Sequence, residues 1–572
     1  MAKRIFGRAL WNRVSLRTST PKETYSTGRA RIVFPIALFL IAFSIYFLTL
    51  APTITWRNDG ADGGDLIAAA YTLGIAHPPG YPVYVVLGKL FTLLPIGDVA
   101  YRVNLMSAFF AAAAIPLVYL ITLGLCRSVV SPSNRSLSRG GGTQACAPWI
   151  AASAAALCFA FSPTFWSQAT IAEVYTLNAF FAALLFYLLL KWRGEDRQRT
   201  AAGKDNRGRC LLLAAFIYGL SLGNHLSILM LGPAVLFLII GGKRRLIAGR
   251  GGSHARGSAA WEPPLLRNKG LLAAGLSFLL GLSIYLFLPM RAMQNPPVNW
   301  GDPHTWSGFL WTVSGQLYRR FAFSLPPSYI PARASAWASL LVQQFGWWGL
   351  LLGLIGLWRC LNENRTFSIF SLLAFSAVVI YAVGYDTTDS YIYLIPSYLV
   401  FATWLGAGIH YLLAALRQVR DGIKVKAALA FASALFLCLP FVSLWRNFSS
   451  LDLSKDRSAY EYGAEAFEFL EPSAIVIADT DPHTFALWYF SYVAGWRPDV
   501  AVLNGTLLGY SWYRDNMRLL HPQVAIPSDG VNALTHLIES NRAHYPIYLT
   551  DDAGLAPHYS FSPRGPLYQL EE

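Results

Sequence analysis

The sequence predicts an α-helical polytopic membrane protein with about 11 transmembrane helices and a small C-terminal α/β domain on the extracytoplasmic side. Two observations support this fold class. The chain of 572 residues is 54% hydrophobic and only 13% charged, whereas soluble domains carry roughly 25% charged residues. Apolar stretches near the length that crosses about 30 Å of hydrocarbon recur up to residue 445. Composition therefore excludes a disordered chain, a collagen and an ordinary soluble enzyme.

The distribution of charge predicts the orientation. A net charge of +15 would also suit a nucleic-acid partner, but the basic residues are concentrated in loops that alternate with apolar stretches, as in membrane topology. Segments assigned to the inside hold 31 Lys/Arg and 7 Asp/Glu, and the rest of the chain holds 15 and 24. The inside segments are residues 1–31, 126–147, 191–210, 241–270, 359–366 and 413–427. We expect the lipid bilayer as a partner and no nucleic acid.

Eleven apolar stretches are assigned as spans. Residues 211–240 are divided at Asn224-His225 because basic residues flank both ends, which favours an outer hairpin tip, and the same reasoning divides residues 148–190. The run 83–94 is too short to cross comfortably and is expected to be re-entrant or interfacial. The spans are residues 32–50, 103–125, 148–162, 174–190, 211–222, 226–240, 271–289, 337–358, 367–384, 391–412 and 427–445.

Three regions follow from these spans. Residues 1–31 form a basic cytoplasmic segment, residues 32–445 the membrane domain and residues 446–572 an extracytoplasmic α/β domain. The long basic flank and long apolar run of the first span indicate a retained anchor rather than a cleaved signal peptide. Together with the compact loops, this favours a prokaryotic plasma membrane.

The C-terminal domain shows short buried strands at residues 474–478 and 500–503 with a helix at 482–494 between them. A third strand is expected at residues 546–550.

The informative polar residues lie on the predicted outer side, above all in loop 51–102. Asp62 and Asp65 are three residues apart at a predicted helix start, so they could face one cavity or simply cap the helix. His77, before two prolines, could contact a phosphate or carry a proton, or be an ordinary surface histidine. Arg102 could bind a lipid phosphate or extend to the membrane surface. Their shared side indicates one outer-face site.

Several motifs together resemble one known family. The first outer loop reads Asp62-Gly-Gly-Asp65, Tyr71-Thr-Leu-Gly, His77-Pro-Pro-Gly-Tyr-Pro82 and Arg102-Val-Asn104. Further matching runs are Ala172-Glu-Val-Tyr-Thr-Leu-Asn178, Gly223-Asn-His225, Trp300-Gly-Asp-Pro-His304, Asp389-Ser-Tyr-Ile-Tyr393 and Ala478-Asp-Thr-Asp-Pro482. Over roughly residues 32–510 the chain resembles the transmembrane protein 260 family of O-mannosyltransferases and their bacterial relatives.

The resemblance implies a membrane glycosyltransferase of the GT-C class, which takes a hexose, here mannose, from a polyprenyl-phosphate donor at the outer face. The family carries an acidic catalytic residue in its first outer loop, which implies catalytic roles for Asp62 and Asp65. Where the family usually has Asp-Ser-Gly-Glu, this chain has Asp62-Gly-Gly-Asp65, so its second carboxylate is one methylene shorter. We therefore favour Asp62 as the general base, with Asp65 as support. One base and one direct displacement would invert the anomeric centre.

The same reaction suggests roles for the other outer residues. The departing phosphate needs cationic or hydrogen-bonding contacts, and the candidates are His77, Arg102, His225 and Arg291. The candidates for substrate binding are Tyr81, Asn104, Glu173, Tyr175, Asn224, Asp302 and Asp389. No cofactor is required because the donor already carries its leaving group. A divalent metal could bind where several Asp meet, but no metal motif occurs. The acceptor is expected to be the hydroxyl of a protein Ser/Thr or of a glycan.

Two rival functions remain open at this stage. A transporter or flippase of a lipid-linked glycan would place polar residues through the membrane midplane and at both faces, often in inverted repeats. A non-catalytic membrane assembly subunit would use the C-terminal domain to bind a partner. The gathering of polar residues on one side and the lack of a visible repeat favour the transferase.

Overall fold

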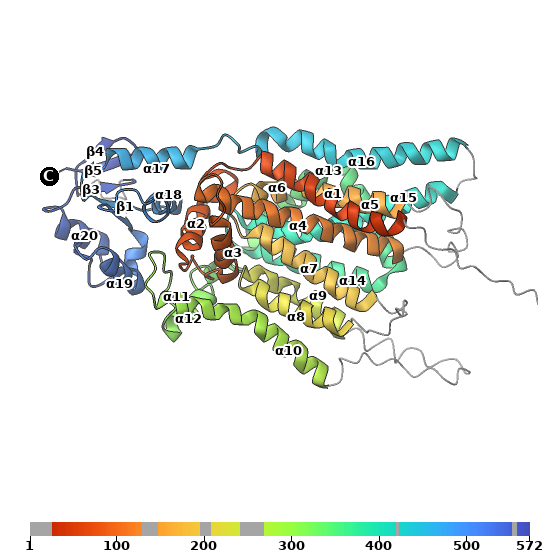
Figure 1. Ribbon diagram of the computed structural model, residues 1–572, viewed down its shortest axis with the longest axis horizontal. Coiled ribbons are helices and arrows are strands. Elements are labelled where there is room, and N and C mark those ends of the chain that lie inside the picture. Colours follow the sequence, from red (N-terminus) through yellow and green to blue (C-terminus); the bar gives the residue numbers. More distant parts are fainter. Residues whose placement is uncertain are drawn as a thin grey trace, which may run out of the picture.

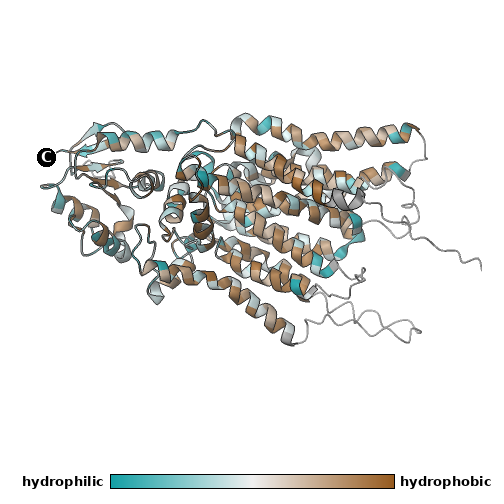
Figure 2. Ribbon diagram, in the orientation of Figure 1, coloured by the Kyte–Doolittle hydropathy of each residue, from teal (hydrophilic) through white to brown (hydrophobic). Residues whose placement is uncertain are grey.

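A computed structural model describes residues 26–128, 147–194, 207–240, 268–418, 423–551 and 558–571. Apolar helices lie side by side in a bundle, and the C-terminal domain lies beyond one end of it (Figure 1). Hydrophobic residues run along the bundle helices, whereas hydrophilic residues gather at the helix ends and in the C-terminal domain (Figure 2). Most of the basic N-terminal segment and of the predicted inside loops 126–147, 191–210 and 241–270 falls outside the described residues, whereas loop 359–366 lies within them.

Each of the predicted apolar stretches is helical. Seven helices are long and apolar enough to cross a membrane, or eight if the pair α5 and α6, bent by 64°, counts as one span. Residues 32–48, 208–222 and 226–240 form shorter apolar helices. The bundle elements are α1 (Ser26–Leu48), α4 (Val99–Ser128), α5 (Ala147–Ala160), α6 (Pro163–Ala169), α7 (Tyr175–Gly194), α8 (Arg207–Leu222), η6 (Leu226–Leu231), α9 (Gly232–Ile240), α10 (Asn268–Leu282), η9 (Ser283–Leu286), α11 (Phe287–Ala292), α13 (Ile330–Glu363), α14 (Arg365–Gly384), α15 (Ile395–Gln418) and α16 (Ile423–Leu451).

Short helices cover the end of the bundle that faces the C-terminal domain (Figure 1). The apolar run 83–94, which the sequence predicts to be too short for a span, forms the 11-residue helix α3 beside α2. An 11-residue helix is much shorter than the roughly 20 residues needed to cross the bilayer, as the sequence predicts for this segment. The elements of this end are η1 (Arg57–Asp62), α2 (Gly63–Thr72), α3 (Pro82–Thr92), α12 (Trp306–Val313), η10 (Arg319–Phe321), η11 (Pro327–Tyr329) and η12 (Ser390–Leu394).

The C-terminal domain is a small α/β unit built on a five-stranded sheet with the order β2-β1-β3-β5-β4. The three predicted strands are present and run parallel, and the predicted helix lies between the first two. Two further strands, β4 and β5, extend the sheet in antiparallel orientation. The elements are α17 (Ser458–Phe469), β1 (Ile475–Ala478), α18 (Asp481–Trp488), η13 (Tyr489–Ala494), β2 (Ala501–Asn504), η14 (Thr506–Gly509), α19 (Ser511–Leu520), α20 (Ala533–Asn541), β3 (Ile547–Leu549), β4 (Phe561–Arg564) and β5 (Leu567–Leu570).

Helix α18 seats the C-terminal domain directly on α2. At Gly64 the approach is so close that an added Cβ would lie 2.2 Å from the carbonyl oxygen of Phe485. The Trp56 indole also donates a hydrogen bond to the Pro482 carbonyl over 3.1 Å. The missing side chain at Gly64 therefore allows the contact between the two domains, and this contact positions the start of α2.

We expect Gly64→Ala to loosen this contact. A methyl group at 2.2 Å from a backbone oxygen forces a backbone shift, and overpacking of this kind typically costs about 1–3 kcal/mol. The thermal midpoint of the purified protein should fall, and protease cleavage between α16 and α17 should accelerate. Gly509→Ala is the matched control in the same domain, because nothing lies within 4 Å of its added Cβ. Equal cleavage of the two variants would contradict this account of the contact.

Candidate active site

A buried carboxylate, Asp65, organises the end of the bundle that faces the C-terminal domain, which is the predicted outer end. It lies in the first turn of α2, where a negative charge interacts favourably with the helix dipole, and it is completely buried. One oxygen accepts hydrogen bonds from the backbone N–H of His77 over 3.0 Å and from His77 Nδ1 over 2.8 Å. The other accepts from Trp300 Nε1 over 2.9 Å. Asp65 therefore fixes the position of His77 through two bonds.

A short backbone pairing brings His77 and Trp300 to Asp65. The chain leaves α2 through Leu73 in the left-handed conformation. Ile75 then donates to the Val298 carbonyl over 2.7 Å, and Trp300 donates to the Ile75 carbonyl over 3.2 Å. This pairing joins segments more than 200 positions apart in the sequence, which explains why the sequence alone does not reveal it.

Asp62 lies on the opposite side of the His77 ring from Asp65. Its carboxylate is 3.6 Å from His77 Nε2, and its side chain is 45% exposed, whereas that of Asp65 is 0% exposed. The imidazole therefore bridges a buried carboxylate and an accessible one. Only Asp62 of this pair can meet a molecule that enters from outside.

The environment shifts the ionisation of both groups. Burial raises the pKa of Asp62 to about 6, with the positive charge of His77 opposing the shift and the charges of Asp481, Asp65 and Asp389 adding to it. Burial would lower the pKa of His77, but the charge of Asp62 and the hydrogen bond to Asp65 outweigh it and raise the pKa to about 9. At neutral pH the site therefore holds an imidazolium beside an ionised carboxylate of raised basicity.

Aromatic rings line the recess around His77. Its ring centroid is 4.9 Å from that of Tyr81 and 5.9 Å from that of Tyr318. Tyr81 in turn stacks on His225 at 6.1 Å. His225 also contacts Tyr175 at 5.4 Å and Tyr393 at 5.6 Å. Residues from five separate outer segments thus form one continuous aromatic wall.

His225 differs from His77 in charge. Burial and the nearby charge of His77 lower the pKa of His225 to about 3, so it is neutral. The Ser227 backbone N–H donates to its Nδ1 over 3.1 Å, which places the ring proton on Nε2. His225 can therefore donate one hydrogen bond but cannot supply a cation.

Two predicted carboxylates and one from the C-terminal domain also act on this recess. Glu173 is buried, and burial followed by the charge of Asp62 raises its pKa well above the usual value. The charges of Asp389 and Asp481 both raise the pKa of Asp62. The site is therefore acidic, with His77 as the imidazolium at its centre.

Three predicted residues are instead bonded to the backbone. Arg102 donates to the carbonyls of Thr92, Ile96 and Gly97 over 2.7–2.9 Å, so it closes the turn between α3 and α4. Arg291 donates to the carbonyls at the end of α2, those of Thr72 and Leu73, and to the side chain of Gln294. Asn104 donates to the carbonyls of Ala51 and Thr53. These bonds favour structural roles, and our proposal for donor binding omits the two arginines.

Two further predicted residues shape turns next to the recess. Asn224 donates to the Val174 carbonyl over 3.1 Å and so joins the α8 hairpin to the segment that carries Glu173. Asp302 accepts from Asn299 over 3.2 Å and pairs with His304 over 2.7 Å. Each residue thereby orders a segment that carries another member of the site.

The structure adds Trp300, Tyr318, Tyr393 and Asp481 to the residues selected from the sequence. Trp300 lies in the run 299–304, from which Asp302 was selected because it is ionisable; the indole N–H of Trp300 makes the contact with Asp65. Asp481 lies 416 positions beyond Asp65 in the chain and comes from a different domain. In the sequence Asp481 belongs to the run Ala478-Asp-Thr-Asp-Pro482, which could contact a sugar or be an ordinary loop after a strand, and we favour the loop.

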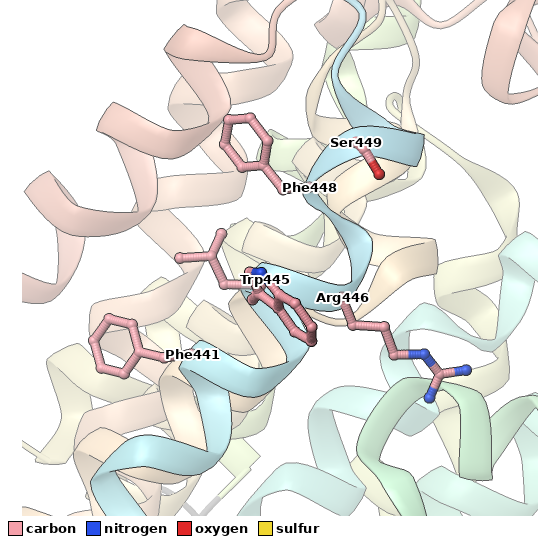
Figure 3. A pocket seen from close by; sticks show the side chains of 6 residues that line it. Phe441, Trp445, Arg446, Phe448 and Ser449 are labelled. Carbon is pink, nitrogen blue, oxygen red and sulfur yellow. The ribbon is translucent and has the colours of Figure 1, made fainter.

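A separate hollow lies on the lipid-facing helix α16. It is lined by Phe441, Leu444, Trp445, Arg446, Phe448 and Ser449 (Figure 3). None of the selected site residues lines it. Aromatic residues and an arginine near the outer end of a span are typical of the membrane interface, so we assign this hollow to the bilayer boundary and not to the site.

Within the described ranges, no three His, Cys, Asp or Glu side chains are grouped as metal ligands.

The comparisons with known proteins agree on one family. A model described as "Protein O-mannosyl-transferase TMEM260 N-terminal domain" matches residues 62–247, and "TMEM260-associated domain 2" matches residues 459–531. Protein O-mannosyl-transferase TMEM260 of Mus musculus is 26% identical over 535 residues, which are 90% of this chain and 68% of the mouse protein. The chain is similar to the TMEM260 family of protein O-mannosyl-transferases over these ranges. The corresponding protein of Dictyostelium discoideum is 24% identical over 92% of this chain and 64% of its own length.

The fold of this chain is similar to that of a solved membrane protein. ArnT from Cupriavidus metallidurans, in a structure bound to undecaprenyl phosphate, superposes with a TM-score of 0.54 at 12% identity, covering 95% of this chain and 98% of ArnT. The apo structure of ArnT superposes with the same TM-score. The predicted membrane fold is thereby confirmed. The first family model begins at Asp62, so its matched range includes Asp62, Asp65 and His77.

Proposed function

We propose that this chain is a membrane glycosyltransferase that moves mannose from a polyprenyl phosphate to an acceptor hydroxyl at the extracytoplasmic face, with inversion. The observation that carries the proposal is the chain of contacts from Asp65 through His77 to Asp62 at the outer end of the bundle. The names of the relatives, protein O-mannosyl-transferases, support mannose as the sugar and a protein Ser/Thr as the acceptor. The undecaprenyl phosphate bound by ArnT supports a polyprenyl-phosphate donor.

Asp62 is the general base in this mechanism. Its carboxylate is accessible, and the raised pKa of about 6 makes it more basic than an ordinary Asp while leaving it ionised at neutral pH. It takes the proton of the acceptor hydroxyl as the oxygen attacks the anomeric carbon. The bond from that carbon to the phosphate oxygen breaks at the same time, so the configuration is inverted.

His77 stabilises the leaving phosphate. Its charge is maintained by Asp65 and Asp62. Nδ1 is bonded to Asp65, whereas Nε2 is 3.6 Å from Asp62, beyond hydrogen-bond distance, so its N–H can still donate to a ligand. As the sugar departs, the phosphate gains negative charge, and a fixed imidazolium lowers the energy of that state. His225 adds a neutral hydrogen-bond donor, and the rings of Tyr81, Tyr175 and Tyr393 offer faces against which a hexose can pack.

Asp65 supports the reaction without touching the substrate. It has no exposed surface, and both of its oxygens already accept hydrogen bonds from His77 and Trp300. Such an arrangement holds the imidazole in one orientation and one tautomer. We therefore assign Asp65 as the positioning residue and Asp62 as the base.

The mechanism predicts a bell-shaped dependence of transfer on pH. The rate should rise as Asp62 loses its proton near pH 6 and fall as His77 loses its proton near pH 9, because the reactive form needs an ionised Asp62 and a charged His77. Initial rates measured from about 1.5 pH units below the pKa of Asp62 to about 1 unit above that of His77 cover both limbs. In His77→Gln the alkaline limb should disappear. An unchanged alkaline limb in that variant would assign the limb to another group.

The proposed reaction is tested by comparing two possible sugar donors. Protein purified in lipid nanodiscs is given radiolabelled polyprenyl-phosphate mannose or nucleotide-linked mannose, together with a Ser/Thr-rich peptide. Label should enter the peptide from the polyprenyl donor alone. Movement of the lipid-linked sugar across the bilayer of a vesicle without transfer would instead indicate a flippase. Neither activity, in protein with a cooperative thermal transition, would indicate an assembly subunit.

A further inference from the structure

Helix α18 of the C-terminal domain contributes a carboxylate to the wall of the recess. Asp481, its first residue, is exposed, and no described donor forms a hydrogen bond with its side chain. Its position is fixed because α18 packs on α2 and η1, with Phe485 against Gly64 and Pro482 bonded to Trp56. Its helix therefore lies against the elements that carry Asp62 and Asp65, and its charge raises the pKa of both Asp62 and Tyr318.

Asp481 lies on the aqueous side of that recess. The C-terminal domain lies beyond the bundle, and α18 is the element that faces α2 (Figure 1). The aromatic residues Tyr81, Tyr175 and His225 of the recess instead come from the starts of α3, α7 and η6. A lipid-linked donor keeps its phosphate close to the membrane surface, whereas a water-soluble acceptor arrives from the side of the C-terminal domain. Asp481 therefore lies on the path of the acceptor.

The negative charge near Asp481 restricts which acceptors can bind. A carboxylate only accepts hydrogen bonds, and Asp479 and the exposed Asp59 lie on neighbouring segments of the same two domains. Arg57 is an exposed cation of η1. An acceptor that offers N–H and O–H groups can bind here. One that carries phosphate or carboxylate groups meets like charge, which is unfavourable at an interface.

We propose that Asp481 is a specificity-determining residue that binds the acceptor, and that it selects a neutral or basic polypeptide segment over an anionic one. This inference rests on the proposed function. It goes beyond that function by assigning acceptor recognition to the C-terminal domain and by giving the class of acceptor. The donor is bound by the aromatic wall and does not depend on Asp481.

The test compares two Ser/Thr peptides that differ only in their flanking residues, Gln in one and Asp in the other. For the wild type, kcat/KM should be about tenfold higher for the Gln-flanked peptide than for the Asp-flanked one. Asp481→Asn should reduce that preference about fivefold, because two like charges about 4 Å apart in water repel each other by about 1 kcal/mol. The KM for the Gln-flanked peptide should rise, and the KM for polyprenyl-phosphate mannose should not change. Asp481→Glu, which keeps the charge, should retain the preference of the wild type for the Gln-flanked peptide. Glu539→Gln, an exposed carboxylate on α20, is the matched control.

Two results would overturn the inference while leaving the proposed function intact. One is transfer by Asp481→Asn with an unchanged preference and unchanged acceptor KM. The other is a rise in donor KM instead of acceptor KM. If the wild type transfers mannose to no peptide, the proposed function itself fails. Asp481→Asn and Asp481→Glu could also both lower the thermal midpoint and weaken the binding of both donor and acceptor. That result would assign Asp481 to the contact between the domains and would also overturn the inference.

Discussion

Replacing Asp62 by Asn should lower the rate of mannose transfer by about 10³-fold, within the 10²–10⁴ range typical of general bases. The amide cannot take the proton of the acceptor hydroxyl. The side chain is 45% exposed, and its one described contact is the 3.6 Å approach to His77, so its loss removes no buried hydrogen bond. Thermal midpoint and donor affinity should stay near those of the wild type. Steady-state kinetics, a thermal melt and binding of labelled donor measure the three quantities.

A carboxylate in another outer loop provides the control for Asp62. Asp386 lies between α14 and α15 and pairs with Arg333 at 3.7 Å. Asp386→Asn removes the same charge from the outer face, and exposed ion pairs contribute about 0–1 kcal/mol. It should retain a rate within a few fold of the wild type. A similar loss in both variants would indicate a general electrostatic effect and would argue against Asp62 as the base.

Replacing Asp65 by Asn should reduce both activity and stability. Asp65 accepts from the His77 backbone, from His77 Nδ1 and from Trp300 Nε1. An amide presents N–H groups to some of these donors, and breaking a buried charged pair typically costs about 3–5 kcal/mol. Transfer should fall about 10²-fold, and the alkaline limb of the pH profile should shift to lower pH, because His77 loses a charge that raises its pKa. Thermal melts and pH–rate profiles measure these effects.

Two conservative variants separate the positioning role of Asp65 from a purely structural one. Trp300→Phe removes the 2.9 Å indole bond to Asp65 and leaves both bonds to His77. It should destabilise the protein with little shift of the alkaline limb. Asp65→Glu keeps the charge and should retain more activity than Asp65→Asn. If Trp300→Phe and Asp65→Asn shift the alkaline limb equally, the contact between Asp65 and His77 does not determine the charge of His77.

The membrane part of the fold could be predicted from the sequence because hydrophobic length directly determines which segments form helices in a bilayer. Every apolar stretch is helical, including the short run that became α3. The first three strands of the C-terminal domain could be predicted for a similar reason, since they are short, apolar and fully buried. The strands β4 and β5 are only partly buried and lack this signal.

The centre of the candidate site was also predictable, but its connections were not. Asp62, Asp65 and His77 stand out because ionisable residues cluster in one outer loop. That Asp65 turns inward to His77 depends on the pairing of Ile75 with Asn299, which no local pattern encodes. The position of Asp481 depends in the same way on the packing of one domain against another.

For the arginines, the sequence does not distinguish a structural role from ligand binding. Arg102 and Arg291 at an outer boundary are compatible with phosphate binding, but in the structure their guanidinium groups bond to the carbonyls that end α3 and α2. Carbonyls at helix ends lack intrahelical partners, and an arginine that satisfies them has the same sequence signature as one that binds a ligand. The three-dimensional contacts of the guanidinium group distinguish the two roles.

The central claim is that the recess at Asp62 transfers a sugar from a polyprenyl phosphate by a single displacement. A single-turnover reaction tests this most directly: wild-type protein is loaded with polyprenyl-phosphate mannose of known anomeric configuration, a Ser/Thr peptide is added, and the glycosidic linkage of the product is determined by NMR. We predict one equivalent of mannosyl peptide with inverted configuration, and no product from Asp62→Asn carrying the same amount of donor. Retained configuration, or equal product from the variant, would contradict the account.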